Sequence, residues 1–375
     1  MSQKTVSNVM QDVFEGSKFK CLPYEKRNLD EDPDSEYREY DHRISGRMFE
    51  YPESNTITTV PTTGVSEQIP SILTYFMDGS RRVFRFCDVI LPNGRYYPVL
   101  AGQVGVAVLQ RTNDRSIRPM RKHVQYKNKV VFPDTINEAD LGAIRVELAK
   151  RKLEFDLGTY PTGKSGGNQN EDYISIGTKQ ILDLMHDLEL EAVRKMMADR
   201  DLRDDAMLVV DGSLQFRREV LRRNNNFPIT QLANVIGISK SFTPSQPVLG
   251  ARSTKHLGTL LQNLEYGQRT PVFKAGHDEF ADVLGVWYLR IRPRRMMSNP
   301  LAGIIKIEVL ANGDEQENGL DRDRIDHLSA LILSERNVTP YGSDNRWANH
   351  IYPIYLTELY LKSGFLSDVY FKGLL

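Results

Sequence analysis

The sequence predicts an α/β protein in which a mixed sheet is flanked by helices. Apolar runs of strand length recur from residue 71 onward, and segments with helical spacing lie between them. Apolar residues make up 40% of the 375 residues and charged residues 26%, as in ordinary globular proteins. We therefore expect one large domain with a buried core over residues 66–375, preceded by an arm over residues 1–65.

The predicted arm is polar and includes the charge-dense segment NLDEDPDSEYREYDHR. A segment that cannot bury a core of its own gains order by binding a partner. Residues 1–65 are therefore a candidate docking segment.

Three strands are expected next, at 71–80, 82–91 and 96–111. A turn at Pro92-Asn93-Gly94 separates the last two, which favours an antiparallel meander. Further along the chain, two segments with helical spacing enclose a Gly-, Asn- and Ser-rich stretch, expected to be an inserted loop near 156–175. The two helices are expected at 136–155 and 178–197.

The remaining elements follow the second helix. A buried-type strand is expected at 206–214 and another strand or strand edge at 231–241. The last third of the chain is expected to hold two strands and two helices, at 284–292, 302–310, 322–335 and 352–361. No fixed-period repeat is present.

Charge and cysteine content exclude several classes of site. Lys plus Arg and Asp plus Glu both number 49, so any nucleic-acid surface must come from local clustering of basic residues. Two cysteines, Cys21 and Cys87, cannot supply a disulfide framework or a cysteine zinc site. The N-terminus has no apolar signal segment and no apolar run reaches roughly 18 residues, so we expect a cytoplasmic protein.

Two acidic residues follow buried-type runs and precede Gly-Ser. Asp78 ends ILTYFM, and Asp211 ends MLVV. Open α/β sheets bind ligands at the ends of such strands, and hard divalent ions require converging carboxylates. The pair therefore predicts a metal site. The alternative is that Asp-Gly is only a favoured turn dipeptide.

The helix between these acids offers a third carboxylate. At about 100° per residue, Glu189 lies within the apolar face, between Met185 and Val193, whereas Glu191 lies outside it. A carboxylate that faces a core requires a partner or a metal. Glu189 is thus the candidate ligand, and the alternative is a pair with a buried arginine.

The ordered set YFMDGS, LELEA, LVVDGSL, VIGISKS, KIEVL and YPIYLTELYL resembles the NurA family of nucleases over roughly residues 70–375. The resemblance implies a ribonuclease-H-like core, Mn²⁺-favoured (or Mg²⁺-dependent) cleavage of DNA and a homodimer. It also implies a HerA-type hexameric ATPase as partner, in DNA end processing or in defence against foreign DNA. Asp78, Glu189 and Asp211 then correspond to metal-binding acids.

One departure from the family concerns its last motif. That motif usually runs from Tyr-Pro to a His or Asp near the start of the final helix, where this chain has Tyr360. His350 or Glu358 could substitute as fourth ligand, or three acids could suffice. Tyr352 matches the motif's tyrosine, with a core-packing role as the alternative, and His350 could also be a surface histidine.

Several basic and aromatic residues are candidates for phosphate or DNA contacts. Lys240 ends the strand ANVIGIS, where an ammonium could meet a phosphate; the alternative is a solvated lysine. In WYLRIRPRR, alternation places one set of residues on a face that could track a DNA backbone, although any half-exposed strand alternates. The candidates for DNA contact are Arg81, Arg82, Tyr288, Arg290 and Arg292, of which the first two could equally belong to a solvated hairpin.

Two rival functions remain. GTYPTGKS at 158–165 satisfies the G-x-x-x-x-G-K-S pattern of P-loop ATPases, but KLEFDL before it is charged and GGNQNEDY after it is a poor helix start. Lys164 would carry nucleotide binding in such an ATPase. The other rival is a non-catalytic DNA-binding or scaffold subunit in which the acids are structural.

Overall fold

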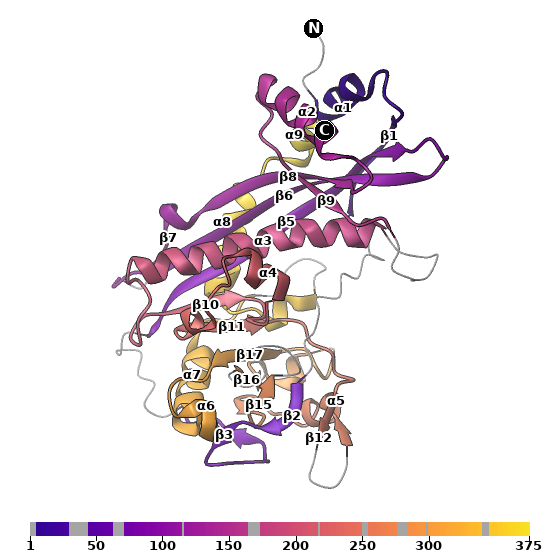
Figure 1. The fold of residues 1–375 in the computed structure, drawn as a ribbon. Coiled ribbons are helices and arrows are strands. Elements are labelled where there is room, and N and C mark those ends of the chain that lie inside the picture. Colours follow the sequence, from indigo (N-terminus) through magenta and orange to yellow (C-terminus); the bar gives the residue numbers. More distant parts are fainter. Residues whose placement is uncertain are drawn as a thin grey trace.

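The computed structural model describes residues 5–29, 44–62, 71–114, 116–163, 173–216, 218–249, 254–275, 284–297, 299–339 and 345–375. These residues form a mixed sheet of 14 strands flanked by helices (Figure 1). The predicted α/β class is therefore confirmed, and the architecture is consistent with a ribonuclease-H-like fold.

The middle of the sheet is a parallel unit of three strands. β10 (Met207–Asp211) lies between β5 (Leu73–Ile90) and β11 (Val235–Ser239), and both neighbours run parallel to it. In this register Val210 pairs with Met77 and Asp211 with Ile238. Because the strands are parallel, the end of β10 lies beside Asp78 and the end of β11.

β5 corrects the meander prediction. The two strands expected at 71–80 and 82–91 are one continuous strand of 18 residues, so the first Asp-Gly-Ser is not a turn. β6 (Tyr96–Arg111) returns antiparallel to β5 after the predicted turn, where Gly94 has a φ of 79°. Beyond β6 lie β7 (Ile117–Pro119) and β8 (Gln125–Pro133), both antiparallel to it.

The other half of the sheet is antiparallel. β17 (Ile304–Leu310) pairs with β11, and β16 (Leu284–Arg290) pairs with β17, which confirms both predicted strands. β15 (Phe273–Ala275) and β2 (Ile44–Met48) complete this edge. β14 (Gln268–Arg269) also pairs with β16.

The described parts of the predicted arm belong to the folded body, which corrects that expectation. α1 (Val6–Phe14) buries Val6, Val9, Met10 and Phe14, which have helical spacing. The sequence analysis missed this helix because it considered only the overall polarity of residues 1–65. β1 (Lys20–Asn28) pairs with β5. β2, β3 (Glu50–Tyr51) and β4 (Thr58–Thr59) each pair with a strand from later in the chain. The charge-dense segment from Asp30 to Arg43 lies outside the described residues.

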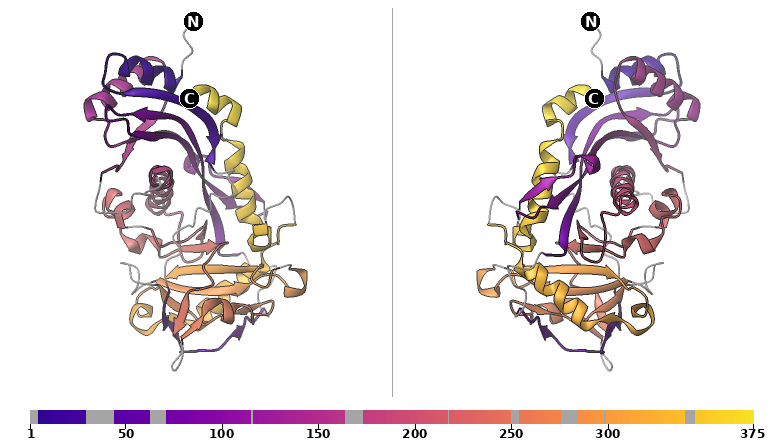
Figure 2. Two further views of the ribbon diagram at one scale, coloured as in Figure 1. Left: turned by 90° about the vertical axis from the view of Figure 1, so that its right-hand side faces the viewer. Right: turned by 90° about the vertical axis from the view of Figure 1, so that its left-hand side faces the viewer.

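Helices cover both faces of the sheet. α3 (Tyr173–Ala198) packs on one face of β5 and β6, and α8 (Tyr352–Ser363) lies on the other face (Figure 2). α2 (Glu138–Lys150), α7 (Arg322–Ser334), α3 and α8 confirm the four predicted helices. The sequence prediction missed α9 (Asp368–Leu374), which follows α8. The amide of Ser7 donates to the carbonyl of Leu375, so the first helix and the chain end lie together.

The remaining elements are short. β9 (Asp156–Tyr160) runs parallel to β8, so residues 156–160 are a strand rather than part of an inserted loop. Residues 164–172 of that predicted loop lie outside the described part of the chain. The other short elements are η2 (Arg121–His123), α4 (Arg218–Arg223), η3 (Ile229–Leu232), β12 (Pro247–Leu249), β13 (Thr254–His256), α5 (Leu257–Leu261), η4 (Arg294–Met296), α6 (Glu315–Asn318), β18 (Leu320–Asp321) and η5 (Asn345–Asn349).

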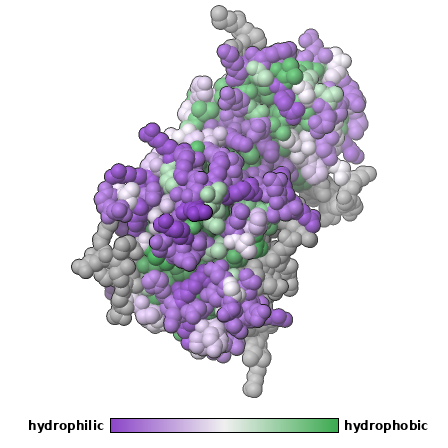
Figure 3. Space-filling view, turned by 60° about the vertical axis from the view of Figure 1, so that its left-hand side comes forward, coloured by the Kyte–Doolittle hydropathy of each residue, from purple (hydrophilic) through white to green (hydrophobic). Residues whose placement is uncertain are grey.

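The surface is mostly polar on the face shown in Figure 3, with hydrophobic side chains gathered mainly toward the end where α1 and α2 lie. Among the helices that the structure describes, none combines the length and apolar character needed to cross a membrane.

Candidate functional site

Asp78 and Asp211 lie side by side on one face of the sheet. Met77 and Val210 belong to the core beneath α3, and side chains alternate between faces along a strand. Asp78 and Asp211 therefore point to the opposite face, the one that carries α8. The side chain of Asp78 is 5% exposed, and Asp211 is the last residue of β10. The two Asp-Gly-Ser segments thus bring two carboxylates together, as predicted.

The two glycines that follow these acids have different roles. Gly212 has a φ of 130°, a conformation that favours glycine, and it turns the chain out of β10. Gly79 continues β5, and a Cβ atom there would lie 2.2 Å from Oε1 of Glu189. Only the second Asp-Gly is therefore a turn dipeptide.

Lys240 and Glu358 complete the group. Nζ of Lys240, directly after β11, lies 2.7 Å from Oδ2 of Asp211 and 3.4 Å from Oε2 of Glu358 on α8. Nε2 of the buried His350 lies 3.7 Å from Oε2 of Glu358. We call Asp78, Asp211, Lys240, His350 and Glu358 the acid–lysine cluster. Both residues considered as substitutes for the family's fourth ligand belong to it.

The surroundings shift the pKa values of Asp78 and Glu358 in opposite directions. Burial, followed by the neighbouring Asp211 carboxylate, raises the pKa of Asp78 well above its usual range. Burial opposes ionisation of Glu358 as well, but Lys240 and Lys362 outweigh it and lower the pKa of Glu358 to about 2. Lys240 also lowers the pKa of Asp78, but burial and the Asp211 carboxylate outweigh it there.

One oxygen of Asp78 has no partner. Oδ2 is buried and makes no hydrogen bond with any residue that the structure describes. A buried carboxylate oxygen without a donor is costly unless a cation or a bound ligand satisfies it. The cluster holds three carboxylates and an imidazole, which are ligand types for a divalent ion, although no three of them place their ligand atoms within 4.8 Å of one another in the described part of the chain.

Tyr352 begins α8 and lies near His350 in sequence. The guanidinium of Arg336 lies 4.8 Å from the centre of the Tyr352 ring, and the ring of Tyr355 lies 6.3 Å away. Tyr360 packs with a small apolar group between α8 and β6 that contains Leu361. Both tyrosines therefore have packing roles, the alternative considered for Tyr352.

Glu189 is buried as predicted, at 3% exposure. Glu191 is more exposed and pairs with Lys195. However, Glu189 lies against Gly79 on the α3 face, opposite Asp78, and its partner is Nδ1 of His186 at 2.9 Å rather than an arginine. In the described part of the chain, Asp78, Glu189 and Asp211 do not gather as a compact set of metal ligands. The prediction that Glu189 is a metal ligand is therefore wrong, because its side chain packs against Gly79 of β5 on the face opposite Asp78.

Replacing Glu189 with Gln is expected to lower the free energy of unfolding by about 1.5–3 kcal/mol, the range for a hydrogen bond to a charged group. The substitution removes the charge of the buried carboxylate that faces His186. Glu191→Gln should change stability by less than about 0.5 kcal/mol, because Glu191 is a solvated acid in an i,i+4 pair. Chemical denaturation of the two variants tests this, and equal losses would contradict it.

Three of the predicted DNA contacts are wrong because their side chains are buried. Tyr288 and Arg290 are 0% exposed and Arg292 is 8% exposed. Arg290 donates to the carbonyls of Leu264, Pro300 and Ala302, and Arg292 donates to those of Val338 and Ala348. Both faces of this alternating segment are thus buried, and Arg290 and Arg292 donate hydrogen bonds to backbone carbonyls.

Arg81 and Arg82 are partly buried on β5. The guanidinium of Arg82 lies 2.9 Å from Oδ1 of Asp368 and donates to the carbonyl of Leu366. Arg82 therefore links β5 to the start of α9, and it does not belong to a solvated hairpin, the alternative considered for it, because β5 is continuous there.

A second group of possible metal ligands lies elsewhere. His123, Asp199 and Asp201 place their ligand atoms within 4.8 Å of one another, so this group could hold a metal ion. Burial, followed by the ammonium of Lys122, lowers the pKa of His123 and leaves its imidazole mostly neutral near pH 7. The sequence analysis did not find this group, because His123 lies 76 positions before Asp199 and 78 before Asp201.

The P-loop pattern is only partly described. Gly158 lies within β9, and α3 begins at Tyr173. Lys164 and Ser165, which would carry nucleotide binding, lie outside the described residues.

Neither the protein-family models nor the curated protein sequences contain a match to this chain.

Proposed function

We propose that this protein is a metal-dependent deoxyribonuclease and that the acid–lysine cluster is its reaction centre. The observation that carries the proposal is the buried Asp78–Asp211 pair where β10 ends, with an Asp78 oxygen that no described residue satisfies. Proteins retain such like-charge pairs at sites where a cation or substrate completes the electrostatics.

The residues of the cluster suit Mn²⁺ or Mg²⁺. Asp78, Asp211 and Glu358 would hold the metal, since hard divalent cations prefer carboxylate oxygens. When bound, the ion supplies Lewis-acid activation of water and of a phosphodiester. The unsatisfied Asp78 oxygen supports this assignment.

The chain's own groups would bind the phosphate and handle the proton. The ammonium of Lys240 lies against Asp211 and Glu358 and would pair with a phosphate oxygen that enters the cluster, and its 14% exposure keeps that charge close to a desolvated site. His350, held near Glu358, would carry a proton to or from the reacting oxygens. Burial of the cluster strengthens both effects by excluding water.

The resemblance to NurA nucleases supports DNA as the substrate and supplies the biological setting of the proposal. In that setting the protein is a cytoplasmic homodimer that works with a HerA-type ATPase hexamer in DNA end processing or defence. In that setting an ATPase motor would feed duplex DNA to the acid–lysine cluster. The two described acids of the cluster on β5 and β10 match the family's ordered motifs.

The test is cleavage of linear and circular duplex DNA by the purified chain with Mn²⁺, Mg²⁺ or a chelator. We expect products with Mn²⁺ and none with the chelator. Unchanged DNA in every condition, on both substrates and on single strands, would favour the scaffold alternative.

Adding a HerA-type hexamer and ATP to the same assay is expected to raise cleavage of long duplexes. The substitution Lys164→Ala should leave that stimulation unchanged. ATP hydrolysis by the chain alone, lost in Lys164→Ala, would instead favour the P-loop ATPase.

A further inference from the structure

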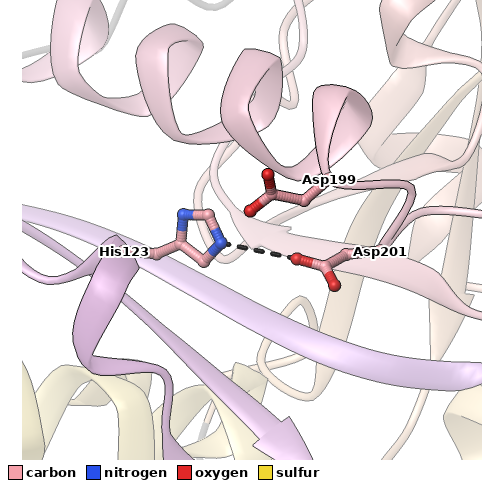
Figure 4. Close-up of side chains that lie close together, drawn as sticks. All are labelled: His123, Asp199 and Asp201. Carbon is pink, nitrogen blue, oxygen red and sulfur yellow. Dashed lines mark ion pairs between the residues drawn. The ribbon is translucent and has the colours of Figure 1, made fainter.

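We infer that His123, Asp199 and Asp201 form a second cation site, separate from the acid–lysine cluster, that takes a divalent transition metal such as Zn²⁺. The inference does not depend on the proposed nuclease activity. Its ligands come from two parts of the chain: His123 ends η2, and Asp199 and Asp201 follow α3. The three side chains point toward one another (Figure 4).

His123 is the observation that distinguishes this group from an ordinary acidic surface. Its side chain is 1% exposed, and neither ring nitrogen makes a hydrogen bond with any described residue. Nε2 faces Oδ2 of Asp201 at 3.5 Å, which is beyond a good hydrogen bond. A buried imidazole with no hydrogen bond is unfavourable, and coordination of a metal by Nε2 would satisfy it.

Both carboxylates of the group, those of Asp199 and Asp201, already pair with the ammonium of Lys122. Its Nζ lies 2.6 Å from Oδ2 of Asp199 and 2.9 Å from Oδ2 of Asp201. The Lys122 side chain is 50% exposed, so the ammonium can move into solvent when a metal arrives. Lys122 therefore acts as a competitor for the site.

The donor set decides the class of metal. One imidazole nitrogen and two carboxylate oxygens suit Zn²⁺ and its transition-metal neighbours better than Ca²⁺ or Mg²⁺, which prefer oxygen ligands alone. Partial exposure of Asp199 leaves room for water as a further ligand. The site thus resembles an open three-ligand centre.

The position of the group suggests what the metal does. Asp199 and Asp201 lie between the end of α3 and β10, while His123 lies between β7 and β8. A bound ion would join these two connections. Since β10 carries Asp211 at its other end, the ion would stabilise the strand on which the acid–lysine cluster depends.

The experiment measures Zn²⁺ binding to the full chain after chelator treatment, by calorimetry and by the shift in melting temperature. The chain used carries Asp78→Asn and Asp211→Asn, which remove two of the three carboxylates of the acid–lysine cluster and so weaken any binding there. We expect one Zn²⁺ per chain, with at least about tenfold weaker binding in Asp201→Asn. The matched control is Asp205→Asn, an exposed acid in the same connection that should leave binding unchanged.

Lys122→Gln provides an independent arm, because removing the competing ammonium should strengthen Zn²⁺ binding several-fold while leaving the ligands in place. Asp199→Asn, at a half-exposed position, tests the site without disturbing the core. The inference would be overturned if the Asp201→Asn, Asp199→Asn and Lys122→Gln chains all bound Zn²⁺ with the affinity of the parent chain.

Discussion

Asp78→Asn is expected to reduce Mn²⁺-dependent DNA cleavage at least about 100-fold while raising the melting temperature of the metal-free protein. Metal stabilisation of the reacting phosphate is worth several kcal/mol, and each 1.4 kcal/mol is about tenfold in rate. Asparagine keeps the volume of the side chain and removes the charge. Rates and thermal unfolding, both measured on the same preparation, test the two halves of this prediction.

The gain in stability follows from the position of Asp78. Its carboxylate is buried beside Asp211, and burial and this like charge both disfavour its ionised form. A neutral amide removes that repulsion, so function and stability change in opposite directions. Asp211→Asn should lose cleavage equally but gain no stability, because it leaves the ammonium of Lys240 without its closest partner.

The matched control is Asp88→Asn, which changes another buried acid on the same strand. Asp88 pairs with Arg85 through two oxygens and lies ten residues from Asp78. Its substitution should leave cleavage unchanged and lower stability moderately. Cleavage that persists in Asp78→Asn, or that falls equally in Asp88→Asn, would reject the acid–lysine cluster as the reaction centre.

Arg269→Met is expected to destabilise the fold by about 3–5 kcal/mol, the range found when one partner of a buried ion pair is removed. The guanidinium of Arg269 is fully buried, with Nη1 2.8 Å from Oε2 of Glu50 and Nε 2.5 Å from Oδ1 of Asp326. Methionine fills similar volume but leaves the buried Glu50 carboxylate with the partly exposed Arg322 as its other cation among the described residues. Chemical denaturation measures the loss.

A second substitution shows how much of the loss comes from the unpaired buried charge of Glu50 and how much from poorer packing. Glu50→Gln added to Arg269→Met should recover part of the stability, because it removes the uncompensated charge. Arg203→Met is the control, since Arg203 pairs with Asp205 at the surface and should change stability by less than about 1 kcal/mol. A similar effect of Arg203→Met and Arg269→Met would contradict the prediction. A large loss at Arg269 would also show that residue 50 belongs to the folded body.

Local patterns were sufficient for most elements and for part of the site. Helical spacing identified α2, α3, α7 and α8 and placed Glu189 inside the apolar face, because the period of a helix determines which residues share a side. The apolar runs before Asp78 and Asp211 indicated buried strands. The parallel arrangement of β5 and β10 then brought the two acids together, at the position where the sequence indicated a metal site.

Other features depend on contacts between distant segments, and a local pattern carries no information about them. The strand WYLRIRPRR alternates like a half-exposed strand, yet Arg290 is buried because carbonyls from residues 264, 300 and 302 receive its guanidinium. Glu189 faces the core as expected, but only the packing of α3 on Gly79 shows that it lies opposite Asp78.

By itself, then, the sequence determined the approximate positions of most strands and helices from residue 71 onward and the burial of Glu189, since these follow from the period of each element along the chain. The tertiary structure decided which buried charges meet. Glu358 approaches Lys240 and His350 only because α8 packs across β5, and His123 reaches Asp199 and Asp201 only because η2 lies beside the end of α3. Electrostatic interactions act through space over a few ångströms, so their partners are determined by the packing of elements that are far apart in the chain.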